Sequence, residues 1–298
     1  MSQTDSMEHI CAIINPNSGK GQHNDLIQSL RDQIGDQVLL TTGNGDKKDI
    51  EGFVKKYTPS LCLVGGGDGT IKLVAETVHD TDIQLAILPL GSANGLAAEW
   101  NIGTNIKLLV EQYLKRSYRT QSLDALLVNG ETCLHMADVG LNASMIKNFN
   151  EQPVRGFTGY ALSAFQELTT TLFTEKQLQF EAYMENRRYT TTMFLIANCK
   201  RYGTGVIVNP KGNPGDGKFE IGPLSGFEMS HLGAYLFGPL DHEAEPFHLF
   251  HRTEAEIKLS RSVDFQVDGE YQGQTNHISI KLLPEFCQIA IPYPGNQS

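Results

Sequence analysis

The stretch LCLVGGGDGTIKLVAETV, residues 61–78, joins a short apolar run to a helical pattern through a loop of four glycines and one acid. Residues 61–64 are typical of a buried strand, and the apolar positions from residue 71 onward recur at helical spacing. Three consecutive glycines cost backbone entropy, so the loop needs either positive φ angles or a close approach to its backbone. A strand, a glycine loop and a helix in this order predict part of a βαβ unit.

The segments around this stretch alternate in the same way. We expect the first helix from about Asn24 to Ile34 and further helices near residues 46–57, 70–80 and 94–100 with its continuation. The expected strands are HICAIINP (9–16), QVLLTT (37–42), SLCLVGG (60–66) and IQLAILPLG (83–91). This alternation predicts a doubly wound α/β nucleotide-binding domain over residues 1–123, with a parallel sheet covered on both faces.

The pattern changes after residue 123. Period-2 segments at 176–199, 218–226, 254–271 and 277–283 predict antiparallel strands, interrupted by two helical segments at 159–173 and 229–240. We therefore predict an α/β protein with a second, antiparallel β-sandwich-like domain over residues 124–288. This second domain would form the acceptor side of a two-domain protein.

Composition limits the function classes. Apolar residues make up 40% and charged residues 19% of the 298-residue chain, as in ordinary globular proteins. The formal net charge of −10 argues against nucleic acid as a partner. The five cysteines have no metal-ligand spacing, which indicates reduced core thiols in a cytoplasmic protein. The first nine residues lack a signal-peptide pattern, and no apolar run reaches the ~20 residues of a membrane span.

Three predicted strands run into loops that suit phosphate: NPNSGKG (15–21), VGGGDGT (64–70) and LPLGSANG (88–95). In a parallel sheet these loops emerge at one edge, where bare backbone N–H groups and helix N-termini bind anions. The first loop lacks the spacing of a Walker A loop, and Asp68 would repel pyrophosphate in a dinucleotide fingerprint. A carboxylate in a phosphate loop is explained if it holds Mg²⁺.

These three loops, followed far downstream by VDGE (267–270), resemble the diacylglycerol kinase catalytic family. That family includes bacterial lipid kinases and sphingosine kinases and is distantly related to NAD kinases. The likeness continues through PVRGFTGYALSAFQEL (153–168), IANCKRYGTG (196–205) and GDGKFEIGPLSG (215–226), so it covers nearly the whole chain. It implies an active site in the cleft between the two domains, and a return of residues 289–298 to the first domain.

The resemblance also implies roles for individual residues. Glu270 would be the general base, and Asp68 would belong to the catalytic Mg²⁺ network, joined through metal-bound water by Asp124. Thr42 is an equally good register for the expected contact of Thr41 with the nucleotide. The residues expected to bind the nucleotide are Asn15, Ser18, Gly19, Thr41, Gly65, Gly66, Gly67, Asp68, Gly69, Thr70 and Ser92.

A second cation site is implied at Asp216, with the backbone oxygens of Asn213 and Lys218 completing its shell. The alternative for Asp216 is a plain Asp-Gly turn. The histidines of DHEAEPFHLFHR (241–252), among them His251, have no ligand-like spacing, so we interpret this segment as a solvated linker.

One departure from the family leaves the acceptor open: many bacterial relatives read Thr-Ala-Asn-Asp where this chain has Ser-Ala-Asn-Gly at 92–95. The leading hypothesis is an ATP- and Mg²⁺-dependent lipid kinase that phosphorylates a hydroxyl of diacylglycerol, a sphingoid base or a related lipid. Such an enzyme would take its substrate from the membrane surface by transient peripheral contact, as a monomer or a homodimer. The alternatives are a kinase of a soluble acceptor, as in the NAD kinase branch, and a catalytically silent nucleotide- or lipid-binding regulator.

Overall fold

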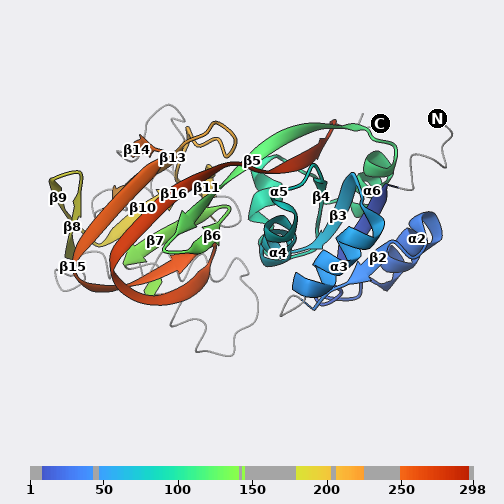
Figure 1. Cartoon of the computed structure of the whole chain (residues 1–298), viewed down its shortest axis with the longest axis horizontal. Helices are drawn as coiled ribbons and strands as arrows, with labels where there is room; N and C mark the ends of the chain where they lie inside the picture. Colours follow the sequence, from blue (N-terminus) through green and yellow to red (C-terminus); the bar gives the residue numbers. More distant parts are fainter. Residues whose placement is uncertain are drawn as a thin grey trace. The chain divides into compact units, whose positions relative to one another are not determined.

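The computed structural model describes residues 9–42, 47–140, 143–144, 179–202, 206–224 and 249–294. Contacts between residues divide the chain into two compact units (Figure 1). The N-terminal unit comprises Met1–Leu123 and Glu285–Ser298, and the C-terminal unit comprises Asp124–Pro284. Two long strands, β5 (Tyr118–Val128) and β16 (Glu270–Pro292), have residues in both units.

The N-terminal unit alternates strands and helices, as predicted. Its other elements in the described part are β1 (Ile10–Ile14), α2 (Asn24–Ile34), β2 (Val38–Leu40), α3 (Lys47–Tyr57), β3 (Leu61–Gly66), α4 (Asp68–Val78), β4 (Gln84–Pro89), α5 (Gly95–Glu99) and α6 (Ile106–Leu114). The predicted first helix is confirmed at its expected bounds, and it is followed by Gly35, whose φ of 63° suits glycine. The expected continuation of α5 is a separate helix, because Asn101 takes a φ of 54° and Asn105 caps α6.

The sheet of this unit is parallel. Its strand order is β2-β1-β3-β4, with residues 288–290 of β16 paired in parallel beside β4. The chain leaves β1 toward β2 and then crosses back to β3, so the direction of winding reverses between β1 and β3. In doubly wound sheets this switch point, at the carboxyl ends of the strands, is the usual place for a ligand.

The core of the N-terminal unit lies between this sheet and its helices. The strand residues of β1 and β3 are fully buried, and α2 turns Ile27, Leu30 and Ile34 inward at helical spacing. Tyr113 of α6 is fully buried, and its hydroxyl donates to the carbonyl of Ile87 at 3.2 Å. Burial raises the pKa of this phenol well above its usual range.

The C-terminal unit is built from antiparallel strands, which confirms the predicted class. Besides β5 and β16 its elements in the described part are β6 (Glu131–Cys133), β7 (Met136–Gly140), β8 (Phe180–Met184), β9 (Arg187–Thr191), β10 (Met193–Ala197), β11 (Arg201–Tyr202), β12 (Val206–Ile207), β13 (Phe219–Leu224), β14 (Phe250–Arg252) and β15 (Glu254–Val267). The order β14-β13-β10-β7-β15-β16 is antiparallel throughout, and β8 joins β15 to β9.

The faces of these strands alternate between core and solvent. In β15 the residues Ala255, Ile257 and Leu259 are buried while their neighbours are exposed, as expected for a sheet with one face on the core. All five cysteines are buried and form no disulfide. The predicted helical segments at 159–173 and 229–240 lie outside the described residues. In the described part of the chain, no helix is both long and apolar enough to cross a membrane.

Candidate active site

The three glycine loops follow neighbouring strands of the parallel sheet. The backbone N–H of Asn15, after β1, donates to the carbonyl of Gly65 at 2.8 Å, and that of Leu90, after β4, donates to Gly66 at 3.0 Å. The Asn15 carboxamide Nδ2 lies 3.4 Å from the Thr70 hydroxyl at the start of α4. The fold therefore joins the loops at 15–21, 64–70 and 88–95 at the carboxyl edge of the sheet.

Close approach, not positive φ, explains most of the glycines at this edge. Gly67 has a φ of −92°, and a Cβ at Gly91 would collide with its Cα. A Cβ at Gly65 would lie 2.6 Å from Cδ1 of Ile14, and one at Gly66 would strike Thr70. The backbones of these loops lie in contact because no side chain intervenes, and this close approach explains the three consecutive glycines at residues 65–67.

Asp68 is held by the backbone of a distant helix. Its Oδ2 accepts the N–H of Gly95 and its Oδ1 accepts the N–H of Leu96, both at 3.0 Å. Each carboxylate oxygen thus satisfies one of the unpaired donors at the start of α5. Gly95, the position at which the sequence departs from the family pattern, places its backbone N–H against Asp68.

Asn94 closes the third loop, a role that the sequence motif alone did not assign. Its Oδ1 accepts the N–H of Gly91 and its Nδ2 donates to the Gly91 carbonyl, both at 2.8 Å. Asn94 takes φ 52° and ψ 44°, a left-handed conformation that asparagine tolerates better than most residues. The signal that could have revealed it is an asparagine placed immediately before a glycine and a helix.

The remaining polar residues expected to bind nucleotide differ in exposure. Ser92 is exposed and Ser18 is half-buried. Thr41 follows β2 and is 1% exposed, whereas the alternative contact Thr42 is exposed. The backbone N–H of Thr41 donates to Ile14 at 2.9 Å, which places Thr41 beside the end of β1.

Gly69 differs from its neighbours. It is exposed in the first turn of α4, its φ lies outside the left-handed range, and a Cβ added to it would meet no atom within 4 Å. Neither backbone conformation nor packing in the described structure requires a glycine here. Glycine in a helix costs roughly 0.5–1 kcal/mol relative to alanine. Within the described residues, neither the backbone conformation nor a neighbouring atom explains the glycine at position 69.

Glu270 lies at the tip of a two-residue hairpin. Val267 of β15 pairs directly with Glu270 of β16, and the turn residues Asp268 and Gly269 have φ angles of 52° and 85°. Two positive φ angles in succession are those of a type I′ turn, for which Asp-Gly is a preferred sequence. The Glu270 side chain is exposed and has no hydrogen-bond partner in the described part of the chain.

The Asp268 carboxylate anchors this turn. Oδ1 accepts the N–H of His135 at 2.9 Å and that of Met136 at 3.3 Å, and Oδ2 accepts the N–H of Leu134 at 3.0 Å. Successive backbone N–H groups form a natural binding site for an anion, here supplied by the chain itself. Sequence reasoning singled out Glu270 and missed Asp268, whose partners lie more than a hundred residues away.

Asp124 and Asp216 meet in one corner of the C-terminal unit. Asp124 is 1% exposed, and its Oδ2 accepts the N–H of Gly217 at 2.8 Å. Asp216 is exposed; its Oδ1 accepts the N–H of Lys218 at 3.1 Å, and its own N–H donates to the carbonyl of Asn213 at 3.2 Å. Residues 213–218 therefore form a tight turn that Asp124 holds through the N–H of Gly217 and the carbonyl of Pro214. The sequence predicted Asp124 and Asp216 in different cation sites.

His251 corrects the interpretation of residues 241–252 as a solvated linker. It lies in β14, which pairs with β13, and its Nδ1 is 2.8 Å from Oε1 of the buried Glu220. The other Glu220 oxygen accepts Asn209 Nδ2 at 2.5 Å. An alternating strand pattern is hard to read in three residues, which explains the error. Residues 241–248 lie outside the described part.

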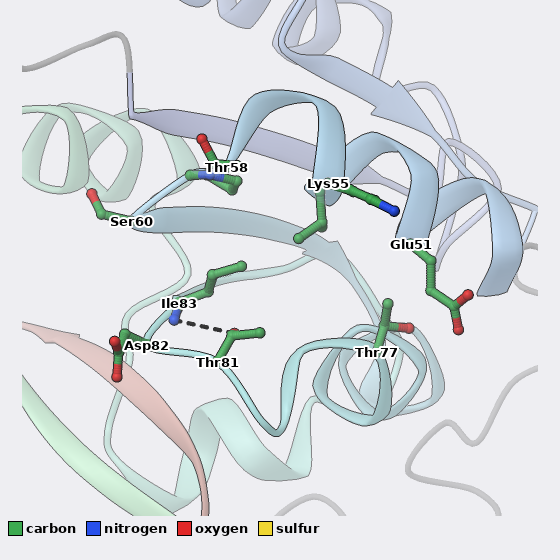
Figure 2. A pocket seen from close by; sticks show the side chains of 10 residues that line it. Glu51, Lys55, Thr58, Ser60, Thr77, Thr81, Asp82 and Ile83 are labelled. Carbon is green, nitrogen blue, oxygen red and sulfur yellow. Dashed lines mark hydrogen bonds between the residues drawn. The ribbon is translucent and has the colours of Figure 1, made fainter.

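The N-terminal unit has a cavity of about 490 Å³, and Figure 2 shows the side chains that line it. Its lining includes Lys55 of α3, Thr58 and Ser60 before β3, and Asp82 and Ile83 before β4. These residues are at the amino ends of the strands, so the cavity is at the edge opposite the loops that bear Asp68 and Ser92. It is not part of the candidate site.

Comparisons with known proteins agree with this geometry. Residues 9–125 match the model of the diacylglycerol kinase catalytic domain, and residues 136–291 match that of the YegS C-terminal NAD kinase beta sandwich-like domain. A protein of Yersinia pestis named "Probable lipid kinase YegS-like" is 26% identical over 96% of this chain and 98% of its own length. An uncharacterized protein of Synechocystis is 28% identical over 94% of this chain and 69% of its own.

Solved structures show the same fold. A crystal structure described as a diacylglycerol kinase from Bacillus anthracis superposes with a TM-score of 0.72 at 22% identity, covering 96% of this chain and 98% of that one. The family models together span both units of the chain. This chain therefore belongs to the diacylglycerol kinase catalytic family, of the YegS type.

Proposed function

We propose that this protein is an ATP- and Mg²⁺-dependent lipid kinase that transfers the γ-phosphoryl group to a lipid hydroxyl. The observation that carries the proposal is the group of glycine-rich loops at the carboxyl ends of the strands, at the switch point of the N-terminal sheet. There the loops after β1, β3 and β4 contact one another, and position 69 carries a glycine that the described fold does not require.

The first turn of α4 is suited to a phosphate. Gly67 occupies its N-cap position without a capping side chain, so the helix start keeps its positive dipole end and unpaired N–H groups for a ligand. A phosphate oxygen can approach Gly69 more closely than any residue with a Cβ would allow. The side chains of Ser18, Thr41 and Ser92 stand at the ends of neighbouring strands or in the loops that follow them, and we assign them to the nucleotide.

Asp68 fits the role of a Mg²⁺ ligand. Its two N–H bonds fix the carboxylate, and each oxygen keeps a second lone pair for a hard cation. When bound, Mg²⁺ would offset the negative charge of the phosphates. We assign Asp124 to the same network. We assign the turn at 213–218 to a structural cation held by Asp216 and the carbonyls of Asn213 and Lys218.

Glu270 is the proposed general base. The acceptor hydroxyl gives its proton to Glu270 while its oxygen bonds to the γ-phosphorus of ATP. The bond from that phosphorus to the bridging oxygen breaks, and ADP leaves. The Glu270 carboxylate is exposed, lies beside a two-residue hairpin turn and has no hydrogen-bond partner among the described residues, so it is available for this task. The names of the Yersinia and Bacillus relatives support a lipid as the acceptor.

We assign the acceptor to diacylglycerol, a sphingoid base or a related lipid taken from the membrane surface. The test is transfer of ³²P from [γ-³²P]ATP into a total lipid extract and, separately, into the water-soluble fraction, with Mg²⁺ or with EDTA. Labelled lipid that appears only with Mg²⁺ is the expected result. Label in the soluble fraction alone would instead identify a kinase of a soluble acceptor. No label in either fraction, with nucleotide still bound, would identify a silent regulator.

A further inference from the structure

The hairpin that bears Glu270 is held by a chain of two buried side chains. Gln266 and Asp138 face each other across β15 and β7, directly paired in the sheet. Gln266 is 1% exposed and Asp138 is 0% exposed. Buried carboxylates are costly, so one at the centre of an otherwise apolar strand needs hydrogen-bonding partners and a reason to be there.

The hydrogen bonds run from Asp138 to the residue before Glu270. Asp138 Oδ1 accepts the N–H of Ala143 at 3.1 Å, and its Oδ2 accepts Gln266 Nε2 at 2.5 Å. With Nε2 committed to Asp138, the Gln266 Oε1 is turned toward the turn and accepts the N–H of Gly269 at 2.7 Å. Gly269 is joined to Glu270 by a single peptide bond.

We propose that Asp138 and Gln266 are positioning residues for Glu270, a role that rests on the proposed function of Glu270 as the base. Asp268 fixes the first turn residue through the N–H groups of residues 134–136, and Gln266 fixes the second. Asp138 determines which way the Gln266 carboxamide faces, because only the NH₂ group of Gln266 can donate to the Asp138 carboxylate. The Glu270 backbone is thereby held from both sides while its side chain stays exposed.

We call the hydrogen-bonded series Asp138–Gln266–Gly269 the relay. The reason for this relay is geometric. Proton transfer requires the base within hydrogen-bond reach of the hydroxyl, and misplacement of about 1 Å can cost ~10²-fold in rate. A free hairpin tip does not provide this precision. The expected signature is a fall in kcat with little change in the KM for ATP, because the nucleotide is assigned to loops of the other unit.

The test is a swap of the pair. Gln266→Glu alone sets two carboxylates against each other. Asp138→Asn alone leaves one hydrogen bond of the relay unmade, whichever way the carboxamides turn. The double variant Asp138→Asn/Gln266→Glu restores all three bonds: the side-chain bond between positions 138 and 266 reverses its direction, and the N–H groups of Ala143 and Gly269 still donate to side-chain oxygens. We expect each single variant to lower kcat by about 10- to 100-fold, and the double variant to recover to within about threefold of wild type.

Glu220→Gln is the matched control. Glu220 accepts Asn209 Nδ2 in a second buried carboxylate–carboxamide pair, which has no hydrogen bond to the hairpin in the described structure. This variant should lower the melting temperature and leave kcat unchanged. All assays run well below the lowest melting temperature of the set, with nucleotide binding measured in parallel.

The outcomes separate the relay from the base. If Glu270→Gln loses its activity but Gln266→Glu keeps the wild-type kcat, the relay is wrong and the base stands. If the singles lose kcat and the swap restores the melting temperature but not kcat, the relay is also wrong. If Glu270→Gln is as active as wild type, the proposed base fails and the relay fails with it. Loss in both singles and recovery of kcat in the swap support the relay.

Discussion

The chain has three Asp-Gly pairs, and two of them, Asp68-Gly69 in the N-terminal unit and Asp268-Gly269 in the C-terminal unit, are used in opposite ways. Asp68 and Asp268 both accept backbone N–H groups from distant segments, at α5 and at residues 134–136. Gly269 needs its φ of 85° to close a type I′ turn. Gly69 has a φ outside the left-handed range, and among the described residues no atom lies within 4 Å of a Cβ added to it, so the described fold does not require its missing side chain.

This difference shows how to separate structural from functional glycines and acids. In the C-terminal unit the pair builds the turn, and the next residue, Glu270, carries the proposed chemistry. In the N-terminal unit the pair itself faces the proposed ligand. A glycine that the fold requires and a glycine that the fold merely tolerates look identical in sequence, and only the space around them distinguishes the two.

The strongest test of the comparison is Glu270→Gln. The carboxamide keeps the size of the side chain but cannot take a proton at neutral pH, so lipid phosphorylation should fall by ~10²–10⁴-fold. Because the side chain is exposed and unpaired in the described structure, the melting temperature and ATP binding should not change. A wild-type rate of lipid labelling would reduce VDGE to a plain hairpin.

Asp68→Asn comes next. It removes the charge proposed to hold Mg²⁺, and we expect at least a ~100-fold loss of transfer. It also turns an NH₂ group toward Gly95 or Leu96, so stability should fall by about 1–3 kcal/mol. Asp268→Asn is the counterpart, since asparagine also tolerates a positive φ; it should lose similar stability with a smaller loss of rate. Equal losses of rate would contradict the assignment of Asp68 to the metal.

Nucleotide binding should stabilise the protein in a Mg²⁺-dependent way. ATP at about 100 times its dissociation constant would add ~2.7 kcal/mol of stability to the nucleotide-binding unit. We expect a clear rise in melting temperature with Mg²⁺ and ATP together, and a smaller one with ATP and EDTA. In Asp68→Asn the two conditions should give the same shift. If wild type itself responds equally with and without Mg²⁺, the metal is not part of the nucleotide site.

The smallest effects come from the two glycines. Gly69→Ala should leave the free energy of unfolding unchanged or raise it by about 0.5–1 kcal/mol, while weakening the binding of ATP. Gly269→Ala should cost roughly 1–2 kcal/mol because it strains the turn. Gly52→Ala, in an open position of α3, is the control that should stabilise without touching ATP affinity. If Gly69→Ala binds ATP as well as Gly52→Ala does, phosphate does not approach Gly69.

Much of the fold class was predictable because its signals are local. The alternation of buried strands with amphipathic helices over the first 114 residues depends on periods of a few residues, as at α2. The hairpin at Asp268-Gly269 is similarly local, because two positive φ angles in succession favour this dipeptide. Short strands such as β14 were missed, since three residues do not establish a period.

The sequence by itself determined which residues stand at the strand ends and which turns they can make. Tertiary structure alone decided that the carboxylates of Asp68 and Asp268 accept backbone N–H groups and that the carboxylate of Glu270 is exposed. The partners of Asp68 lie 27 and 28 residues away, and those of Asp268 lie 132 to 134 residues away. Strand order brings these segments together, and no local period encodes it. For the same reason, only the folded chain reveals that Gly91 is needed for backbone contact with Gly67 and that no described neighbour requires a glycine at position 69.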